Sequence, residues 1–266
     1  MNAAAGMLSV QGICKSHFDP NTGAQAEVLD SVSITVNDHE FVSVIGPSGC
    51  GKSTLLRIVA GLDQPNTGDI SVAGKRVSRP GADRGMVFQE YALFPWKTTQ
   101  ANVEFGPLLK GAGKDERAAT AKRFIELVGL KGSEQKYPHQ LSGGMRQRAA
   151  VARALANNPK ILLMDEPFAA VDAMTRQRLQ EELTAISASE RTTVLFVTHA
   201  IEEAVFLSDR VVVLSDRPGR VIADMKIELD RPRQWNELTR DARFTDYCAQ
   251  LTRLLYGANA VPESRQ

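Results

Sequence analysis

Short apolar runs and turn residues alternate through positions 7–45 of this 266-residue chain. Apolar and polar positions alternate with a period of two over 31–36, and turn-forming residues cluster at 19–23. This pattern is typical of antiparallel strands joined by turns. We therefore predict a small antiparallel β subdomain near the N-terminus.

A strand, a glycine-rich loop and a helix follow in that order. Residues 41–45 are rich in β-forming side chains, and residues 46–51 contain three glycines. A helical pattern begins at Lys52 and stops at Gly61. Its apolar face carries Leu55, Leu56, Val59 and Ala60. This unit is the first candidate for a functional site, because strand–loop–helix turns bind phosphate groups.

The second half of the chain alternates strand and helix patterns, which predicts a parallel sheet covered by helices on both faces. The predicted elements are strands at 161–164, 193–197 and 210–214, and helices at 175–187 and from 201 onward.

Two further stretches are predicted to be helical. Within about 90–155, the segments 118–128 and 145–156 have helical spacing and no β-rich run intervenes, which predicts a helical insert. Beyond residue 230 the chain becomes polar and then offers one helix. That helix places Phe244, Cys248, Leu251 and Leu255 in register.

Composition narrows the class of protein. The chain has 32 Lys and Arg against 31 Asp and Glu, so bulk charge does not favour a nucleic-acid binder. The three cysteines are widely spaced without a CxxC pair, which favours a reducing compartment over a disulfide or zinc scaffold. No apolar run approaches the roughly 18 residues of a membrane span, and no signal peptide is evident.

The glycine-rich loop matches the phosphate-binding pattern G-x-x-x-x-G-K-[ST] without a mismatch. Lys52 is expected to reach the β- and γ-phosphates of ATP, and the Ser53 hydroxyl to ligate Mg²⁺. Cys50 is interpreted as a small residue at a variable position, although a helix N-terminus can lower a thiol pKa. The predicted ATP-binding residues here are Gly46, Pro47, Ser48, Gly49, Cys50, Gly51, Lys52, Ser53 and Thr54.

An acidic pair follows the apolar strand at 161–164. Asp165 is placed to hold Mg²⁺, and Glu166 is the candidate base for the attacking water. The pair alone would also fit the start of a helix. Together with the phosphate loop, it predicts a P-loop NTPase.

The segment 141–148 reads LSGGMRQR. Ser142 is expected at a helix N-cap, and Gly143 and Gly144 would weaken an ordinary helix by on the order of 1 kcal/mol each relative to Ala. Glycines there are explained if a phosphate approaches closely. At this point the chain resembles the ATP-binding subunits of ABC transporters, whose signature is LSGGQ, with Met145 in place of Gln.

The resemblance extends from about residue 8 to 220 and implies the role of further residues. Gln89 matches the glutamine that ligates Mg²⁺ and links the site to the helical insert. Asp172 matches the D-loop aspartate, although the residue before it is not the usual Leu. His199 matches the switch histidine at the γ-phosphate, and joins Glu166 and Gln89 as a catalytic candidate. Either His17 or Phe18 stacks on adenine, and the sequence does not decide between them.

The resemblance also implies the fold, the domains and the partners. The fold is an α/β P-loop NTPase of ABC type: a RecA-like core, an N-terminal antiparallel β subdomain and a helical insert. We expect an ATPase domain at 1–225, with a helical subdomain at about 90–158, and a helical extension at 226–266. The signature implies a homodimer, or a pair with a similar ATPase subunit, on the cytoplasmic face of the inner membrane. Integral membrane permease subunits and, indirectly, an extracytoplasmic solute-binding protein are the other expected partners, and no nucleic acid is expected.

Four short segments narrow the resemblance to importers of nitrate, taurine and aliphatic sulfonates: 74–77, 80–85, 93–96 and 217–220. The aromatic stretch 92–96 either lines a groove for the permease or belongs to the core. We therefore expect an ATPase subunit that powers import of a small anionic solute, whose identity the sequence does not give. An alternative is a soluble ABC-type ATPase not coupled to transport, although these usually carry two cassettes or a long coiled coil. A metabolite kinase would not need the signature or His199.

Overall fold

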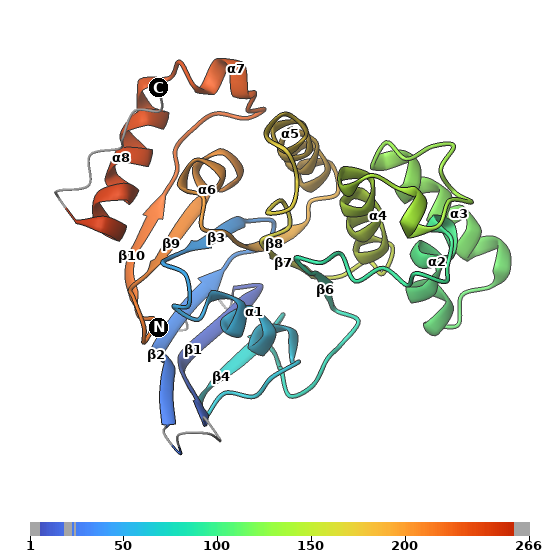
Figure 1. Cartoon of the computed structure of the whole chain (residues 1–266). Helices are drawn as coiled ribbons and strands as arrows, with labels where there is room; N and C mark the ends of the chain where they lie inside the picture. Colours follow the sequence, from blue (N-terminus) through green and yellow to red (C-terminus); the bar gives the residue numbers. More distant parts are fainter. Residues whose placement is uncertain (1–5, 19–22, 24, 258–266) are drawn as a thin grey trace.

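A computed structural model describes residues 6–18, 23 and 25–257 of the chain (Figure 1). One antiparallel sheet has the strand order β2-β1-β4-β5. The antiparallel pair β1–β2 was predicted, whereas β4 and β5, which follow the phosphate loop in sequence, were not. The turn predicted at 19–23 falls, except for Gly23, outside the described residues. The strands are β1 (Leu8–Phe18), β2 (Gln25–Val36), β4 (Thr67–Val72) and β5 (Lys75–Arg76).

The second sheet has six strands in the order β10-β9-β3-β8-β7-β6. Five of them run parallel, as predicted, and β10 pairs antiparallel with β9 at one edge. The sequence pattern predicted neither β6 nor β10. The strands are β3 (Phe41–Ile45), β6 (Arg84–Val87), β7 (Ile161–Asp165), β8 (Thr193–Val197), β9 (Arg210–Leu214) and β10 (Val221–Lys226).

This six-stranded sheet is buried on both faces. In β3, Val42 and Val44 join a core shared with the N-terminal sheet and with α1 (Lys52–Ala60). Phe41 and Ile45 point to the opposite face and join a second core. Helices α4 (Gly143–Leu155), α5 (Ala173–Ser189) and α6 (Ile201–Leu207) supply that second core. Helices on both faces are the expected cover for a parallel sheet.

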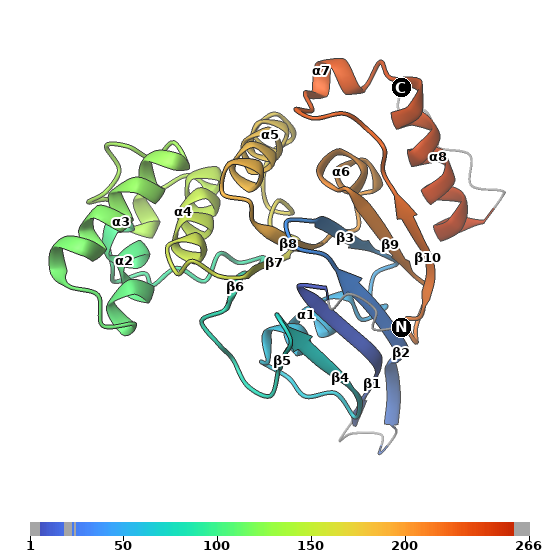
Figure 2. The same ribbon diagram turned by 180° about the vertical axis from the view of Figure 1, so that it is seen from behind.

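A cluster of helices lies beside the β6 edge of the sheet in both views (Figures 1 and 2). It consists of α2 (Thr99–Leu109), α3 (Lys114–Leu127) and α4, and a short 3-10 helix (Pro138–Gln140) precedes α4. The helical spacings at 118–128 and 145–156 correspond to α3 and α4; α4 agrees to within two residues at both ends, whereas α3 begins four residues earlier than predicted. The helix α2 was not predicted; it contains Gly106 and Pro107, which normally disfavour a helix.

The C-terminal segment (residues 227–257) packs over α6 and β9, near the β10 edge (Figure 1). It contains α7 (Trp235–Leu238) and α8 (Ala242–Tyr256). The predicted register of α8 is confirmed: Phe244 and Leu251 are buried, and Cys248 and Leu255 pack half-buried beside them. Within the residues that the structure describes, no helix combines the length and apolarity of a membrane span.

Candidate functional site

The glycine-rich loop joins the end of β3 to the start of α1. Gly49 and Gly51 have φ angles of 81° and 103°, a region that favours glycine. A Cβ atom on Gly51 would also lie 2.6 Å from Leu29 Cδ2, so both conformation and space require glycine there. The first-turn N–H groups of α1 open toward this loop, as they do in anion sites at helix N-termini.

Lys52 is buried and its ammonium lies inside the loop. Its Nζ donates to Gly46 O at 2.8 Å and to Pro47 O at 2.9 Å. Cys50 is fully buried, and burial raises the pKa of its thiol. The structure therefore favours packing over reactivity for Cys50.

The turn between β9 and β10 packs directly on the phosphate loop. A Cβ atom on Gly219 would lie 2.2 Å from Cys50 O, so the two backbones approach as closely as glycine allows. Gly219 N donates to Val28 O at 2.9 Å, and Asp30 N donates to Gly219 O at 3.0 Å. From the sequence, 217–220 stands out only as a family-like segment, because nothing in a single sequence shows this contact.

Ser53 and Asp165 meet at the mouth of the loop. Ser53 Oγ donates to Asp165 Oδ1 at 2.8 Å, and Gln89 is exposed in the turn after β6, the strand next to β7. Burial raises the pKa of Asp165, and the hydrogen bond from Ser53 opposes that rise. These oxygen donors fit Mg²⁺, which commonly takes one or two protein ligands plus phosphate oxygens. In the described part of the chain, no group of three His, Cys, Asp or Glu residues is arranged to hold a metal ion.

Glu166 and His199 form a second pair at the same edge of the sheet. They follow the neighbouring parallel strands β7 and β8, and His199 Nδ1 lies 2.9 Å from Glu166 Oε2. Glu166 has a φ of 42°, which is uncommon for a residue with a side chain, and its N–H donates to Val197 O at 2.9 Å. A base candidate is thus held in a strained conformation by a fixed backbone contact.

The signature segment begins α4, away from its own phosphate loop: α4 belongs to the helices beside β6, whereas α1 lies beneath the sheet (Figure 1). Ser142 is the N-cap, as predicted, and accepts from Met145 N at 3.3 Å. A Cβ atom on Gly144 would lie 2.9 Å from Thr175 Cγ2, so packing alone explains this glycine, whereas Gly143 has more room.

The remaining predicted contacts are exposed. Asp172 is the N-cap of α5 and accepts from Thr175 N at 3.0 Å, which lowers the pKa of its carboxyl. His17 and Phe18 end β1, and both are exposed, Phe18 to 68%. The two rings therefore remain alternatives for stacking on adenine.

Comparison with known proteins decides the family. The sequence profile described as ABC transporter matches residues 29–169, from β2 through the acidic pair. The chain belongs to the ABC transporter ATP-binding family. It is an ABC transporter ATPase, and the fold expected for that family is confirmed by a solved dimeric, post-hydrolysis structure of the ATP-binding cassette MJ0796 bound to ADP and Pi. That structure is 32% identical with a TM-score of 0.73, and the match covers 84% of this chain and 100% of the other.

Two relatives of this ABC ATPase are import proteins. The nitrate import ATP-binding protein NrtD of Synechocystis sp. is 47% identical over 234 residues, 86% of this chain and 88% of the relative. The aliphatic sulfonates import ATP-binding protein SsuB of Bacillus cereus is 44% identical over 229 residues, 86% of this chain and 89% of the relative.

Proposed function

We propose that this ABC ATPase powers import of a small anionic solute, of the nitrate, taurine or sulfonate type, through a partner permease. The observation that carries the proposal is its identity of 44–47%, over most of the chain, to relatives described as nitrate and sulfonate importers. The solute itself is recognised by the permease and by an extracytoplasmic binding protein, which is only an indirect partner of this subunit.

The chemistry is assigned to the two pairs described above. Residues 46–54 hold the phosphates of ATP, and Ser53, Asp165 and Gln89 hold Mg²⁺. Mg²⁺, when bound, offsets the negative charge of the phosphate oxygens. Glu166 accepts a proton from the attacking water, and His199 orients that carboxylate and contacts the γ-phosphate. The 2.9 Å contact between these two side chains supports their assignment as one unit.

The active unit is proposed to be a dimer, either of two copies or with a similar ATPase subunit. Ser142, Gly143, Gly144 and Met145, together with Asp172, would then act on the nucleotide bound by the other subunit. Support comes from the dimeric state of the solved relative and from the separation of α4 and α1 within one chain. Met174, two residues after the D-loop aspartate, is 85% exposed, as a residue at such an interface would be in a single chain.

The permease is proposed to dock beside α2, at the cytoplasmic face of the inner membrane. Trp96 and Leu109 are 71% and 73% exposed, and the half-buried Phe94 ring lies 4.6 Å from that of Phe105. An exposed apolar surface of this kind favours docking over a core role for 92–96. We accordingly assign 90–158 to a helical subdomain within the ATPase domain 1–225, and 226–266 to a C-terminal extension.

Reconstitution tests this proposal. The subunit is co-expressed with the permease and binding protein encoded beside it, and the purified complex is placed in liposomes. We expect ATP-dependent uptake of one of nitrate, taurine or an alkanesulfonate, and no uptake with the Glu166→Gln variant. An ATPase that purifies without any membrane protein, and whose rate no solute changes, would instead indicate a soluble ABC-type ATPase.

A further inference from the structure

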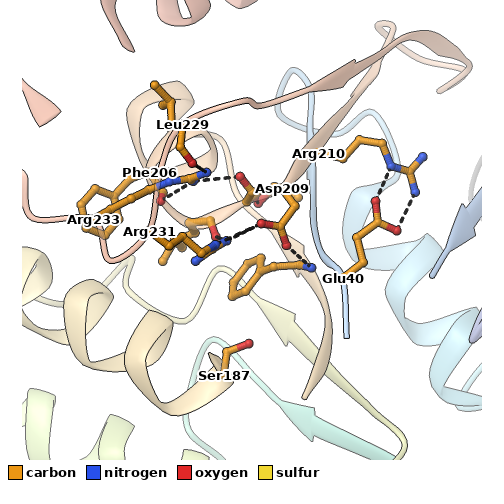
Figure 3. Close-up of polar contacts among 12 residues, drawn as sticks. Glu40, Ser187, Phe206, Asp209, Arg210, Leu229, Arg231 and Arg233 are labelled. Carbon is orange, nitrogen blue, oxygen red and sulfur yellow. Dashed lines mark hydrogen bonds and ion pairs between the residues drawn. The ribbon is translucent and has the colours of Figure 1, made fainter. Parts of the chain in front are cut away.

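The C-terminal segment is anchored on the helix that follows His199. Arg233 is 4% exposed, and its Nη1 donates to the carbonyls of Val205, Phe206 and Ser208 at 2.9–3.0 Å (Figure 3). Its Nη2 donates to Leu229 O at 3.0 Å, within the C-terminal segment. Arg233 therefore satisfies the free carbonyls at the end of α6 and ties that helix to the segment.

Trp235 extends this anchor to α5. Its ring stacks on Phe206 with the centroids 4.3 Å apart, and meets the edge of Phe244 at 6.0 Å. Its indole Nε1 donates to Gln180 Oε1 at 3.0 Å, and its backbone N donates to Glu181 Oε1 at 3.0 Å. The position of the indole is therefore fixed by its packing on two aromatic rings and by two hydrogen bonds, one from the ring and one from the backbone of Trp235.

Gln180 links Trp235 to a buried acid, Glu203. Its Nε2 donates to Glu203 Oε1 at 2.6 Å, and the two side chains are 1% and 6% exposed. Because the indole of Trp235 supplies a donor and Glu203 supplies an acceptor, the amide has only one orientation that satisfies both.

Glu203 faces the loop that carries His199. Burial raises the pKa of Glu203, and the neighbouring Thr198 and Gln180 side chains oppose that rise. Thr198 Oγ1 in turn accepts from Ala200 N at 3.0 Å, so it braces the backbone on both sides of His199. One cavity joins the acid to the proposed catalytic pair; its lining includes Glu166, Arg176, Thr198, His199 and Glu203.

We propose that Glu203 is a positioning residue for ATP hydrolysis: held by Gln180 and Trp235, it fixes the loop at Thr198 so that His199 meets the Glu166 carboxylate. The inference rests on the roles assigned to His199 and Glu166 under the proposed function. A buried carboxylate costs more free energy than an apolar side chain of similar size, so packing alone does not require an acid here. Through Trp235, the C-terminal segment is thereby linked to the site of hydrolysis.

Substitution of Glu203 in the full-length protein tests the proposal. In Glu203→Leu we expect kcat for ATP to fall about tenfold or more while KM changes less than about twofold, because misplacement of His199 affects the transition state and not ATP binding. Glu203→Gln keeps an oxygen that accepts from Gln180 and should recover most of the lost kcat. In the Glu203→Leu/His199→Ala double variant, kcat should equal that of His199→Ala alone.

A second pair of variants probes the C-terminal segment. Trp235→Phe keeps a ring stacked on Phe206 and removes the indole N–H, so kcat should fall about threefold with KM unchanged. The matched control is Phe244→Leu, which removes the edge contact with Trp235 but no hydrogen bond. It should lower the thermal unfolding midpoint and leave kcat unchanged. This pair decides the question if Glu203→Leu does not fold.

The outcomes separate this inference from the function on which it rests. A His199→Ala protein with unchanged kcat would overturn the roles assigned under the proposed function. A strong loss of kcat in His199→Ala, with folded Glu203→Leu as active as the unmodified protein, would overturn the positioning role alone. Equal losses of kcat in Trp235→Phe and Phe244→Leu would likewise overturn it, since only one of them removes the hydrogen bond.

Discussion

Ser53 and Asp165 are 112 positions apart in the sequence, and the Ser53 hydroxyl donates a 2.8 Å hydrogen bond to the Asp165 carboxylate. The contact ties the first turn of α1 to the end of β7. Two oxygen atoms this close together can both act as ligands of one small divalent cation that also binds phosphate oxygens.

Ser53→Ala should raise the concentration of Mg²⁺ that supports half-maximal ATPase activity, because one of the proposed protein oxygens is lost. We expect a shift of about tenfold, the order seen when a group that holds a metal site is removed. ATPase rates measured across a Mg²⁺ titration give the shift. An unchanged Mg²⁺ requirement would contradict the assignment of Ser53 as a ligand.

Glu166→Gln should keep ATP binding and lose nearly all turnover, since an amide can hydrogen-bond water but cannot accept its proton. The variant should accumulate as an ATP-bound dimer, which gel filtration detects as a larger species. Turnover within about threefold of the unmodified protein would exclude Glu166 as the base.

Ser142→Arg should leave ATP binding intact and reduce hydrolysis steeply, because the bulky side chain stands at the N-cap of α4, away from the phosphate loop of its own chain. Calorimetry gives the ATP affinity, and phosphate release gives the rate. Full ATPase activity in dilute, demonstrably monomeric Ser142→Arg protein would show that the signature does not act across a dimer.

Mixing Ser142→Arg with Lys52→Ala subunits sharpens that test. Lys52→Ala alone should weaken ATP binding by roughly 1.5–3 kcal/mol, the value of a charge-assisted hydrogen bond. In a mixed dimer both changes fall on one composite site, and the other site keeps all of its residues. The mixture should therefore hydrolyse ATP faster than either variant alone.

Cys248 should resist alkylation in the folded protein. Burial, reinforced by the charge of Glu202, raises the pKa of its thiol to about 12. At pH 8 only about one molecule in ten thousand then carries the thiolate, and the native protein should react only as the pH approaches 12, whereas the unfolded chain reacts near its ordinary pKa of about 8.5. Mass spectrometry after iodoacetamide treatment, with and without urea, gives both rates; equal rates at pH 8 would contradict the shift.

Local motifs explain how much of the fold the sequence predicted. The phosphate loop and the strands at 161–164 and 193–197 were readable because glycine spacing and continuous apolar runs are properties of neighbouring residues. The edge strand β10 was missed although its exposure alternates along the strand, since Asp224 and Lys226 make the segment polar. The helix α2 was missed because it contains Gly106 and Pro107, which normally disfavour a helix.

The residues of the site likewise fall into those that local motifs identified and those that they did not. Glu166 and His199 were identified because each follows a strand of a recognisable motif. By contrast, Trp235 lies 55 positions from Gln180, and Gln180 lies 23 positions from Glu203. Only the tertiary fold brings these three residues together. The one signal in the sequence was the pair of acids Glu202 and Glu203 at the start of α6, and the sequence pattern does not show that Glu203 is the buried one.

The close approach of Gly219 to Cys50 also bears on how this ATPase can move. Gly219 is hydrogen-bonded to β2 while its backbone lies against the phosphate loop, so the N-terminal sheet, the loop and the β9–β10 turn are in direct contact at this residue. Close-packed groups of this kind shift together or not at all. We therefore expect these three parts to behave as one rigid body during turnover, leaving relative motion to the helices beside β6.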